Sequence, residues 1–162
     1  MKAITIWQPW ASLWACQAKL FETRSWATSY RGPIAIHASA LNPFSAIKPV
    51  PDDTVAEMRK ALKEIGILTP STDFRVLPLG CVVATADLVG CWKIDSIQEL
   101  SSAPWETGYW DDRMNWHDVS DQEIMFGDWT PGRYAWEITN VKMLDIPVPA
   151  KGKQGLWNWE AA

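Results

Sequence analysis

The feature that most constrains the fold of this chain is an apolar stretch over residues 80–89. Apolar side chains there occupy both odd and even positions, so both faces of a strand formed by this stretch must be covered. The pattern therefore predicts a strand inside a closed or covered sheet. Further strands are predicted over residues 20–26, over 34–38, where Ile34 and Ile36 alternate with smaller or polar residues, and as a strand pair over 133–144.

Two helices are predicted around these strands. Pro9 suits the first position of a helix that continues to about Lys19. A second, amphipathic helix begins at a capping box formed by Thr54 and Glu57 and ends at Gly66. The prolines of residues 43–51 indicate a linker, and residues 101–132 are expected to form a long loop with one short helix near 121–126.

These elements predict a single α+β domain over residues 1–162. Strands outnumber helices, cluster together and do not alternate with helices in regular βαβ units. We expect a small mixed β-barrel of about five or six strands, with two or three helices over its ends. A chain of 162 residues is normally one domain, and no internal repeat or domain boundary is evident.

The charge of the chain limits its partners. A net charge of −4 argues against non-specific attraction to nucleic-acid backbones, which needs an excess of Lys and Arg. The charge is unevenly distributed, however. Residues 1–50 contain five basic residues and one acidic residue, whereas residues 105–128 contain seven acidic residues and one basic residue. If the fold keeps these regions apart, the first provides a basic surface for an anion.

Apolar runs and the spacing of cysteine, histidine and acidic residues indicate the expected compartment and cofactors of the protein. No segment approaches the ~20 apolar residues of a membrane span, and the first residues lack a secretion signal, so we expect a cytoplasmic protein without membrane association. Cys16, Cys81 and Cys91 show no CxxC spacing and are expected to be buried, reduced thiols. The two histidines are far apart, and the acidic residues lack regular ligand spacing. We expect no metal and no other cofactor.

The densest polar group in the basic region is formed by Lys19, Glu22 and Arg24. In a strand, Glu22 and Arg24 point to the same face, where two donors and one acceptor can surround a planar polar ligand such as a nucleobase. Trp26 is expected on that face as a stacking residue. The alternative is an ordinary surface ion pair.

Other candidates lie farther along the chain. His37 has a pKa suited to proton transfer, and its alternative is a hydrogen-bonded strand histidine. Lys151 and Lys153 flank a glycine and can bind a phosphate, or they belong to a simple turn. Most of the twelve tryptophans are expected in the core. The better candidates for stacking, besides Trp26, are Trp105, Trp110 and Trp116.

Residues 17–26, QAKLFETRSW, resemble the GxKxxExR signature of the ASCH domain, a branch of the PUA-like superfamily. Four further blocks resemble family segments in the same order: residues 4–11, 31–38, 80–91 and, near the end, 132–137 with 151–157. The resemblance thus spans nearly the whole chain and points to a single-domain member from bacteria or phages. One departure is Gln17, which stands where the family has glycine, so a positive φ at this position must be accommodated otherwise.

The resemblance implies a PUA-like β-barrel whose cleft binds RNA or a modified nucleoside through Lys19, Glu22, Arg24, Trp26, Lys151 and Lys153. It also implies an alternative, since some relatives are N4-acetylcytidine amidohydrolases and others are reported as ribonucleases. In that case Lys19, Glu22 and His37 would be the catalytic residues, although Glu22 replaces the threonine nucleophile of the amidohydrolases. A third alternative is a protein-interaction module that uses the acidic, Trp-rich loop.

Overall fold

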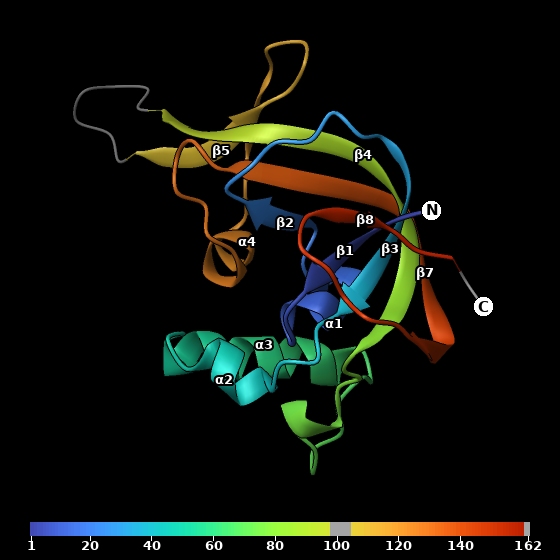
Figure 1. The fold of residues 1–162 in the computed structure, drawn as a ribbon. Coiled ribbons are helices and arrows are strands. Elements are labelled where there is room, and N and C mark those ends of the chain that lie inside the picture. Colours follow the sequence, from blue (N-terminus) through green and yellow to red (C-terminus); the bar gives the residue numbers. More distant parts are fainter. Residues whose placement is uncertain (98–104, 161–162) are drawn as a thin grey trace.

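A curved, eight-stranded sheet forms the main body of the protein in the computed structural model, with helices inside its curve, beside it and below it (Figure 1). The structure describes residues 1–97 and 105–160. The helices are α1 (Trp10–Ala15), α2 (Pro43–Ile47), α3 (Asp52–Glu64), the 3₁₀ helix η1 (Phe74–Val76) and α4 (Asp121–Phe126). The strands are β1 (Lys2–Ile6), β2 (Phe21–Arg24), β3 (Gly32–Ala38), β4 (Cys81–Ile97), β5 (Glu106–Trp110), β6 (Trp116–Asp118), β7 (Tyr134–Pro149) and β8 (Leu156–Asn158).

The strands pair in the order β2-β7-β4-β3-β1-β8, and β5 joins β4 to β6. The β1–β3 pair is parallel, whereas the other pairs are antiparallel. The predicted α+β class is confirmed. The predicted barrel is not confirmed, because the sheet is not closed: β2 and β8 stand at opposite ends of the pairing order. The expectation of five or six strands and two or three helices was also too low for the described residues.

Strand β4 is covered on both faces, as its apolar run predicts. Val83 packs in one cluster with Ile34, Ile36 and Trp136, whereas Val82 packs in another with Trp157. Register shifts interrupt the β4–β7 pairing at several points. Such irregularities bend a strand, because they disrupt the regular pairing with its neighbour. The predicted strand pair over 133–144 is instead part of one strand, β7, which passes through Asn140 with φ +51° and continues to Pro149.

The helical layer has its own apolar cluster. Leu13 of α1 packs there with Met58 and Leu62 of α3, Phe74 of η1 and Phe126 of α4. The amphipathic pattern of α3 is thereby confirmed. Its capping box is not, because α3 begins at Asp52, one turn earlier than Thr54 would require, and no side chain caps it.

Two segments expected to be irregular contain regular structure. The proline-bearing linker of residues 43–51 includes α2, since Asn42 caps this helix by accepting a hydrogen bond from Phe44 N (2.9 Å) and Pro43 suits its first turn. The predicted loop of residues 101–132 contains the β5–β6 hairpin before α4. Asp111 Oδ1 accepts hydrogen bonds from the amides of Arg113 and Asn115 and so closes the hairpin turn. Residues 101–104 of that prediction lie outside the described residues.

The turn between α1 and β2 places the signature residues. Gln17 adopts φ +62°, the left-handed conformation usually left to glycine. The chain reverses there, Gln17 N donates to Trp14 O (3.2 Å), and Lys19 N donates to Leu13 O (3.0 Å). The non-glycine residue thus accommodates the backbone geometry that the family's glycine would favour, and β2 begins at Phe21, two residues after Lys19.

Three expectations concern cysteines, metals and membranes. The cysteines are unpaired, as expected, but only Cys81 is fully buried, whereas Cys16 and Cys91 are half-buried. Within residues 1–97 and 105–160, no group of three His, Cys, Asp or Glu side chains is placed to hold a metal ion. None of the helices seen in these ranges is long and apolar enough to cross a membrane.

Candidate functional site

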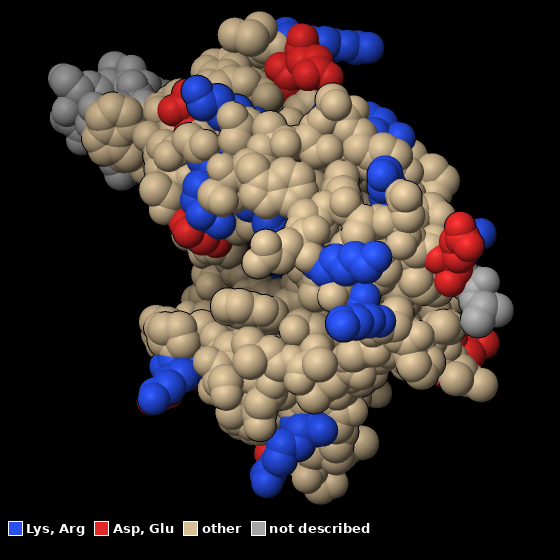
Figure 2. Space-filling model, in the orientation of Figure 1, with Lys and Arg blue, Asp and Glu red and all other residues tan. Residues whose placement is uncertain are grey.

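A pocket of about 600 Å³ lies between the helical layer and the β2 edge of the sheet. In the space-filling view the outline is notched between α4 above and α3 below (Figure 2). One wall is polar and comes from β1, β2 and the segment after α4. The opposite wall is apolar and comes from the residues around α2, α3 and α4. A concave site with an apolar lining and a few converging polar groups is the usual form of a small-ligand site.

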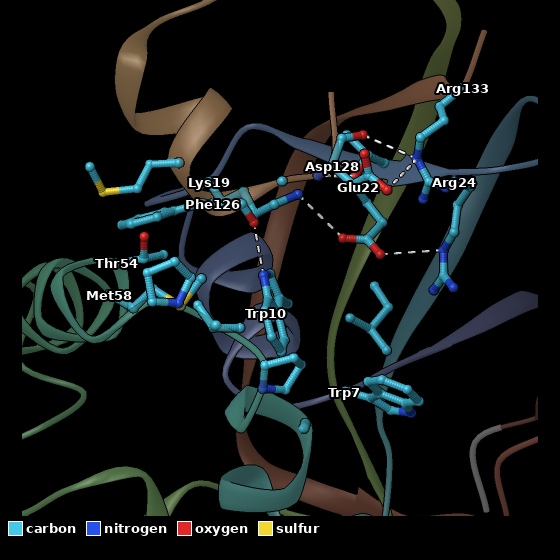
Figure 3. A pocket seen from close by; sticks show the side chains of 18 of the residues that line it. Trp7, Trp10, Lys19, Glu22, Arg24, Thr54, Met58, Phe126, Asp128 and Arg133 are labelled. Carbon is cyan, nitrogen blue, oxygen red and sulfur yellow. Dashed lines mark hydrogen bonds and ion pairs between the residues drawn. The ribbon is translucent and has the colours of Figure 1, made fainter. Parts of the chain in front are cut away.

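The polar wall brings together the three charged signature residues (Figure 3). The Glu22 carboxylate lies between two cations, with Oε2 3.3 Å from Lys19 Nζ and Oε1 3.3 Å from Arg24 Nε. Arg24 Nη2 also donates to Thr5 O (3.0 Å), which ties β2 to β1. The predicted juxtaposition on one face of a strand is therefore present in this wall.

The three side chains differ in exposure, and the difference indicates which of them can contact a ligand. The Lys19 side chain is 1% exposed, that of Glu22 10% and that of Arg24 25%. Lys19 Nζ donates to Phe21 O as well as to Glu22, so its ammonium group holds the carboxylate from behind. Glu22 and Arg24 are the groups left to meet a ligand, and within residues 1–97 and 105–160 Arg24 Nε has no hydrogen-bond acceptor in spite of its ion pair.

A second ion pair lies beside this group. Arg133 Nε is 3.2 Å from Asp128 Oδ2, and both residues line the pocket (Figure 3). Thr23 Oγ1 accepts a hydrogen bond from Asp128 N (3.0 Å), which anchors the segment after α4 to β2. Each pocket cation is thereby within 4 Å of a carboxylate, and the wall combines donors and acceptors with little uncompensated charge.

The apolar wall carries an exposed aromatic ring at its edge. Trp10 is half-buried and donates from Nε1 to Phe126 O (2.8 Å), which joins α1 to α4 (Figure 3). Trp7 is 55% exposed, although it also lines the pocket. The wall is completed by apolar side chains from β1, α2, the α2–α3 connection, α3 and α4: Ile6, Ala46, Pro49, Val50, Pro51, Met58, Met125 and Phe126.

Trp26 lies apart from the pocket. Strand β2 ends at Arg24, two residues before Trp26, so the strand alternation on which its expected position depends is lost. Its ring packs edge-on against Trp136, with centroids 4.6 Å apart, and Trp136 Nε1 donates to Trp26 O (3.4 Å). Trp26 is not among the residues that line the pocket.

His37 and the basic segment form a separate group. His37 is buried in β3, its Nε2 lies 2.9 Å from Ala150 O, and burial lowers the pKa of its imidazole. Gly152 passes so close that an added Cβ would lie 2.6 Å from the His37 ring. Lys151 and Lys153 are exposed on either side of this glycine. None of these residues lines the pocket, although Gly152 also adjoins the Thr5 side chain.

The acidic region does not stay apart from the basic one. Asp128 lines the pocket, and Glu123 of α4 is buried next to Lys19 and Glu22. By contrast, Asp111 lies in the β5–β6 turn, where His117 and Asn115 hold the pKa of its carboxyl well below the usual range. The basic surface expected from residues 1–50 is therefore partly neutralised.

Sequence reasoning missed the residues that complete the pocket. Trp7 was overlooked as a ligand-facing aromatic, and so were Trp10, Arg133 and the apolar wall. The sequence does contain a signal for Trp7. In a strand its side chain would point to the face opposite Ile4 and Ile6, and it stands two residues before Pro9. No local signal marked Arg133 or Met58, because more than thirty residues separate each of them from the signature.

The geometry defines a mixed-sheet domain with a ligand-sized pocket at a charged strand. A comparison with protein families matches residues 4–148 to the ASCH domain. This match covers most of the chain, and the protein therefore belongs to the ASCH domain family, which is associated with RNA binding or related activity in general. The matched range includes the whole pocket but ends before Lys151 and Lys153. A search of curated proteins finds no match.

Proposed function

We propose that the pocket binds a nucleobase, presented by single-stranded RNA or by a modified nucleoside. The observation that carries the proposal is the Glu22 carboxylate, held between Lys19 and Arg24 at the pocket wall and faced by an apolar wall. A nucleobase has the matching form, with apolar faces and a polar edge. Unpaired bases are commonly held by stacking on aromatic rings and by hydrogen bonds to their edges.

Each pocket group has a defined part in this proposal. Glu22 accepts from a base N–H, and Arg24 donates to a neighbouring ring nitrogen or carbonyl through guanidinium N–H groups that its contact with Thr5 does not use. Trp7 provides the exposed ring for stacking. Lys19 holds the Glu22 carboxylate in place.

The charge pattern supports a base rather than a phosphate inside the pocket. Lys19, Arg24 and Arg133 each lie close to a carboxylate, so the pocket offers little free positive charge to a phosphate. Lys151 and Lys153 are exposed, next to the residue that adjoins Thr5. They are the proposed contacts for phosphates outside the pocket, and their removal should reduce the salt dependence of RNA binding by about one counterion per lysine.

The first experiment titrates single-stranded RNA and modified nucleosides into the protein and follows tryptophan fluorescence. Arg24→Ala should weaken binding by roughly 10- to 100-fold, the range for a hydrogen bond from a charged group. The matched control is Arg75→Ala, which removes an arginine that also pairs with a carboxylate two residues earlier but lies outside the pocket. Equal loss in both variants, or none in Arg24→Ala, would contradict the proposal.

A second experiment tests the stacking ring. Trp7→Ala should cost about 1–3 kcal/mol of binding free energy, as expected for one stacked base. Trp105→Ala is the control, since Trp105 is 66% exposed and is not a pocket residue. Isothermal titration calorimetry separates this effect from the change in fluorescence that any tryptophan substitution causes. If Trp105→Ala shows the larger loss, the ligand lies at the β5–β6 hairpin instead.

Hydrolysis is the second candidate function, favoured by the contact between the buried Lys19 ammonium and a carboxylate that reaches the pocket. Glu22 is then the candidate base, whereas His37 lies outside the pocket. The assay incubates the protein with N4-acetylcytidine and with RNA, with and without Mn²⁺, beside Glu22→Gln. Product that forms with the wild type and not with the variant supports hydrolysis. No product at high protein concentration rejects it and leaves binding as the function.

A further inference from the structure

A buried carboxylate of helix α4, that of Glu123, contacts the signature segment. Glu123 Oε1 accepts a hydrogen bond from Leu20 N (2.5 Å), and Oε2 accepts one from Phe21 N (3.4 Å). These are the first two amides after Lys19. Glu123 is 4% exposed and lies about a hundred residues away in the sequence, so only the fold brings it to this position. The Ser120 hydroxyl caps α4 by accepting from Glu123 N (3.2 Å).

We propose that Glu123 is a positioning residue of the pocket, which holds Lys19 and, through it, the Glu22 carboxylate in the geometry for binding. The inference rests on the proposed function for what this positioning serves, but the positioning itself can be measured without a ligand. It assigns a role in the pocket to a residue that does not line it.

The position of β2 explains why such a residue is needed. Among the described strands, β2 is at the end of the pairing order and pairs with β7 alone, so the amides at its start have no strand partner there on the other side. A buried amide without an acceptor costs about 1–3 kcal/mol. Glu123 accepts from the buried Phe21 amide and from the partly buried Leu20 amide. It thereby fixes the backbone between Lys19 and the two groups that the Lys19 side chain contacts, Phe21 O and the Glu22 carboxylate.

The charges around Glu123 fit this arrangement. Lys19, from the turn before β2, and Glu22, from β2, are the charged groups that face it. Burial raises the pKa of the Glu123 carboxyl, and the repulsion from Glu22 adds to this rise. The amide hydrogen bonds and Lys19 oppose it. Carboxylates and cations thus alternate from Glu123 through Lys19 and Glu22 to Arg24.

Removal of the Glu123 charge should not detach α4, because other contacts also hold this helix. Trp129 Nε1 donates to the backbone oxygen of Glu123 (2.7 Å), and Trp10 Nε1 donates to Phe126 O. Gln122 Nε2 donates to Ala18 O (2.7 Å). The substitution Glu123→Gln keeps the size of the side chain and all of these contacts, and therefore tests the carboxylate alone.

The ligand-free test measures the acetylation rate of Lys19 by mass spectrometry, with acetic anhydride as the reagent. Lys19 in the wild type should react at least tenfold more slowly than the exposed Lys60. Glu123→Gln should raise the rate at Lys19 about tenfold, whereas Asp121→Asn, the same charge change at an exposed site of α4, should leave it unchanged. An unchanged rate in Glu123→Gln, or an equal rise in Asp121→Asn, overturns the proposal.

A nuclear magnetic resonance titration separates positioning from a general loss of structure. The Leu20 and Phe21 amide signals should move with pH in the wild type and stay fixed in Glu123→Gln, while the Trp10 and Trp129 indole signals remain unchanged. Persistence of the amide titration in the variant overturns the assignment. In the binding assay, Glu123→Gln should bind about tenfold more weakly, and equal affinity also overturns it. If the wild type binds no RNA or nucleoside, the proposed function fails, and acetylation and pH titration still decide the role of Glu123.

Discussion

Two acid–arginine ion pairs in the described part of the chain have the same spacing, and one of them lies in the pocket whereas the other lies outside it. Asp73 and Arg75 lie at η1 and form several short contacts, including Arg75 Nη2 to Asp73 Oδ2 at 2.6 Å, with Arg75 77% exposed. Glu22 and Arg24 lie on β2 at 3.3 Å and are mostly buried. The pair with the better geometry is the one in solvent.

The difference shows what distinguishes a binding pair from a surface pair. Asp73 and Arg75 satisfy one another, and their attraction is screened by water, so they contribute little to stability or recognition. Glu22 is shared between two cations, and Arg24 Nε finds no hydrogen-bond acceptor among the described residues. Because the hydrogen-bonding groups of this half-buried pair are only partly used within the protein, they remain available to a ligand. The apolar wall opposite favours a ligand that also has an apolar surface.

The largest expected effect is on stability and comes from the cation behind Glu22. Lys19→Met should lower the free energy of unfolding by roughly 3–5 kcal/mol, because it removes one partner from a buried pair. Lys60→Met removes an exposed lysine from an ion pair of equal spacing, Lys60–Glu57 at 3.2 Å, and should change it by at most about 0.5 kcal/mol. Urea unfolding measures both. Similar losses in the two variants would contradict the expectation that the buried ion pair stabilises the protein more than the exposed one.

A smaller effect is expected at the turn that leads into β2. Gln17→Gly should raise the free energy of unfolding by about 0.5–1 kcal/mol, because glycine adopts a positive φ without steric cost. The loss of the Gln17 side-chain hydrogen bond to Trp14 O (3.1 Å) limits the gain. The expected increase in melting temperature is about 1–4 °C. A decrease would show that this side chain contributes more than the backbone strain costs.

The smallest effect is expected on the pH dependence of stability and comes from Asp73, which is paired with the exposed Arg75. Arg75 lowers the pKa of Asp73 from 3.8 to about 2. Because the folded-state pKa lies below the unfolded value, the contribution of Asp73 to stability is present above about pH 4 and is lost as the pH falls toward 2. Asp73→Asn should therefore lose slightly less stability than the wild type between pH 5 and 2, as measured by urea midpoints. Parallel pH profiles of the two proteins would contradict this.

Much of the sheet was predictable because its patterns are local. The alternation of Ile34 and Ile36 and the two-sided apolar run of β4 identify strands from neighbouring residues alone. Amphipathic spacing identified α3 in the same way, but not where it begins, because the prolines and acidic residues before Thr54 extend it. The hairpin in the predicted loop depends on the Asp111 turn, whose side-chain bonds follow no simple periodicity.

The site was predictable only where its residues are neighbours in the sequence. Lys19, Glu22 and Arg24 were identified together because one short strand carries them. The two acid–arginine pairs cannot be told apart from sequence, since burial is set by distant segments. Trp26 was expected beside Arg24, but β2 ends at Arg24 and Trp26 packs on Trp136. Trp7, Arg133 and Glu123 reach β2 from other parts of the chain, and only the fold shows their proximity.

The ligand is proposed to enter the pocket at Glu22 and Arg24, and the indole N–H signals of the twelve tryptophans report where it binds. In a ¹H–¹⁵N spectrum of the labelled protein, addition of single-stranded RNA or a modified nucleoside should shift the Trp7 and Trp10 signals, because both rings line the pocket. The Trp105 and Trp116 signals should stay in place. Shifts confined to Trp105, Trp110 or Trp116, with Trp7 and Trp10 unmoved, would contradict the account.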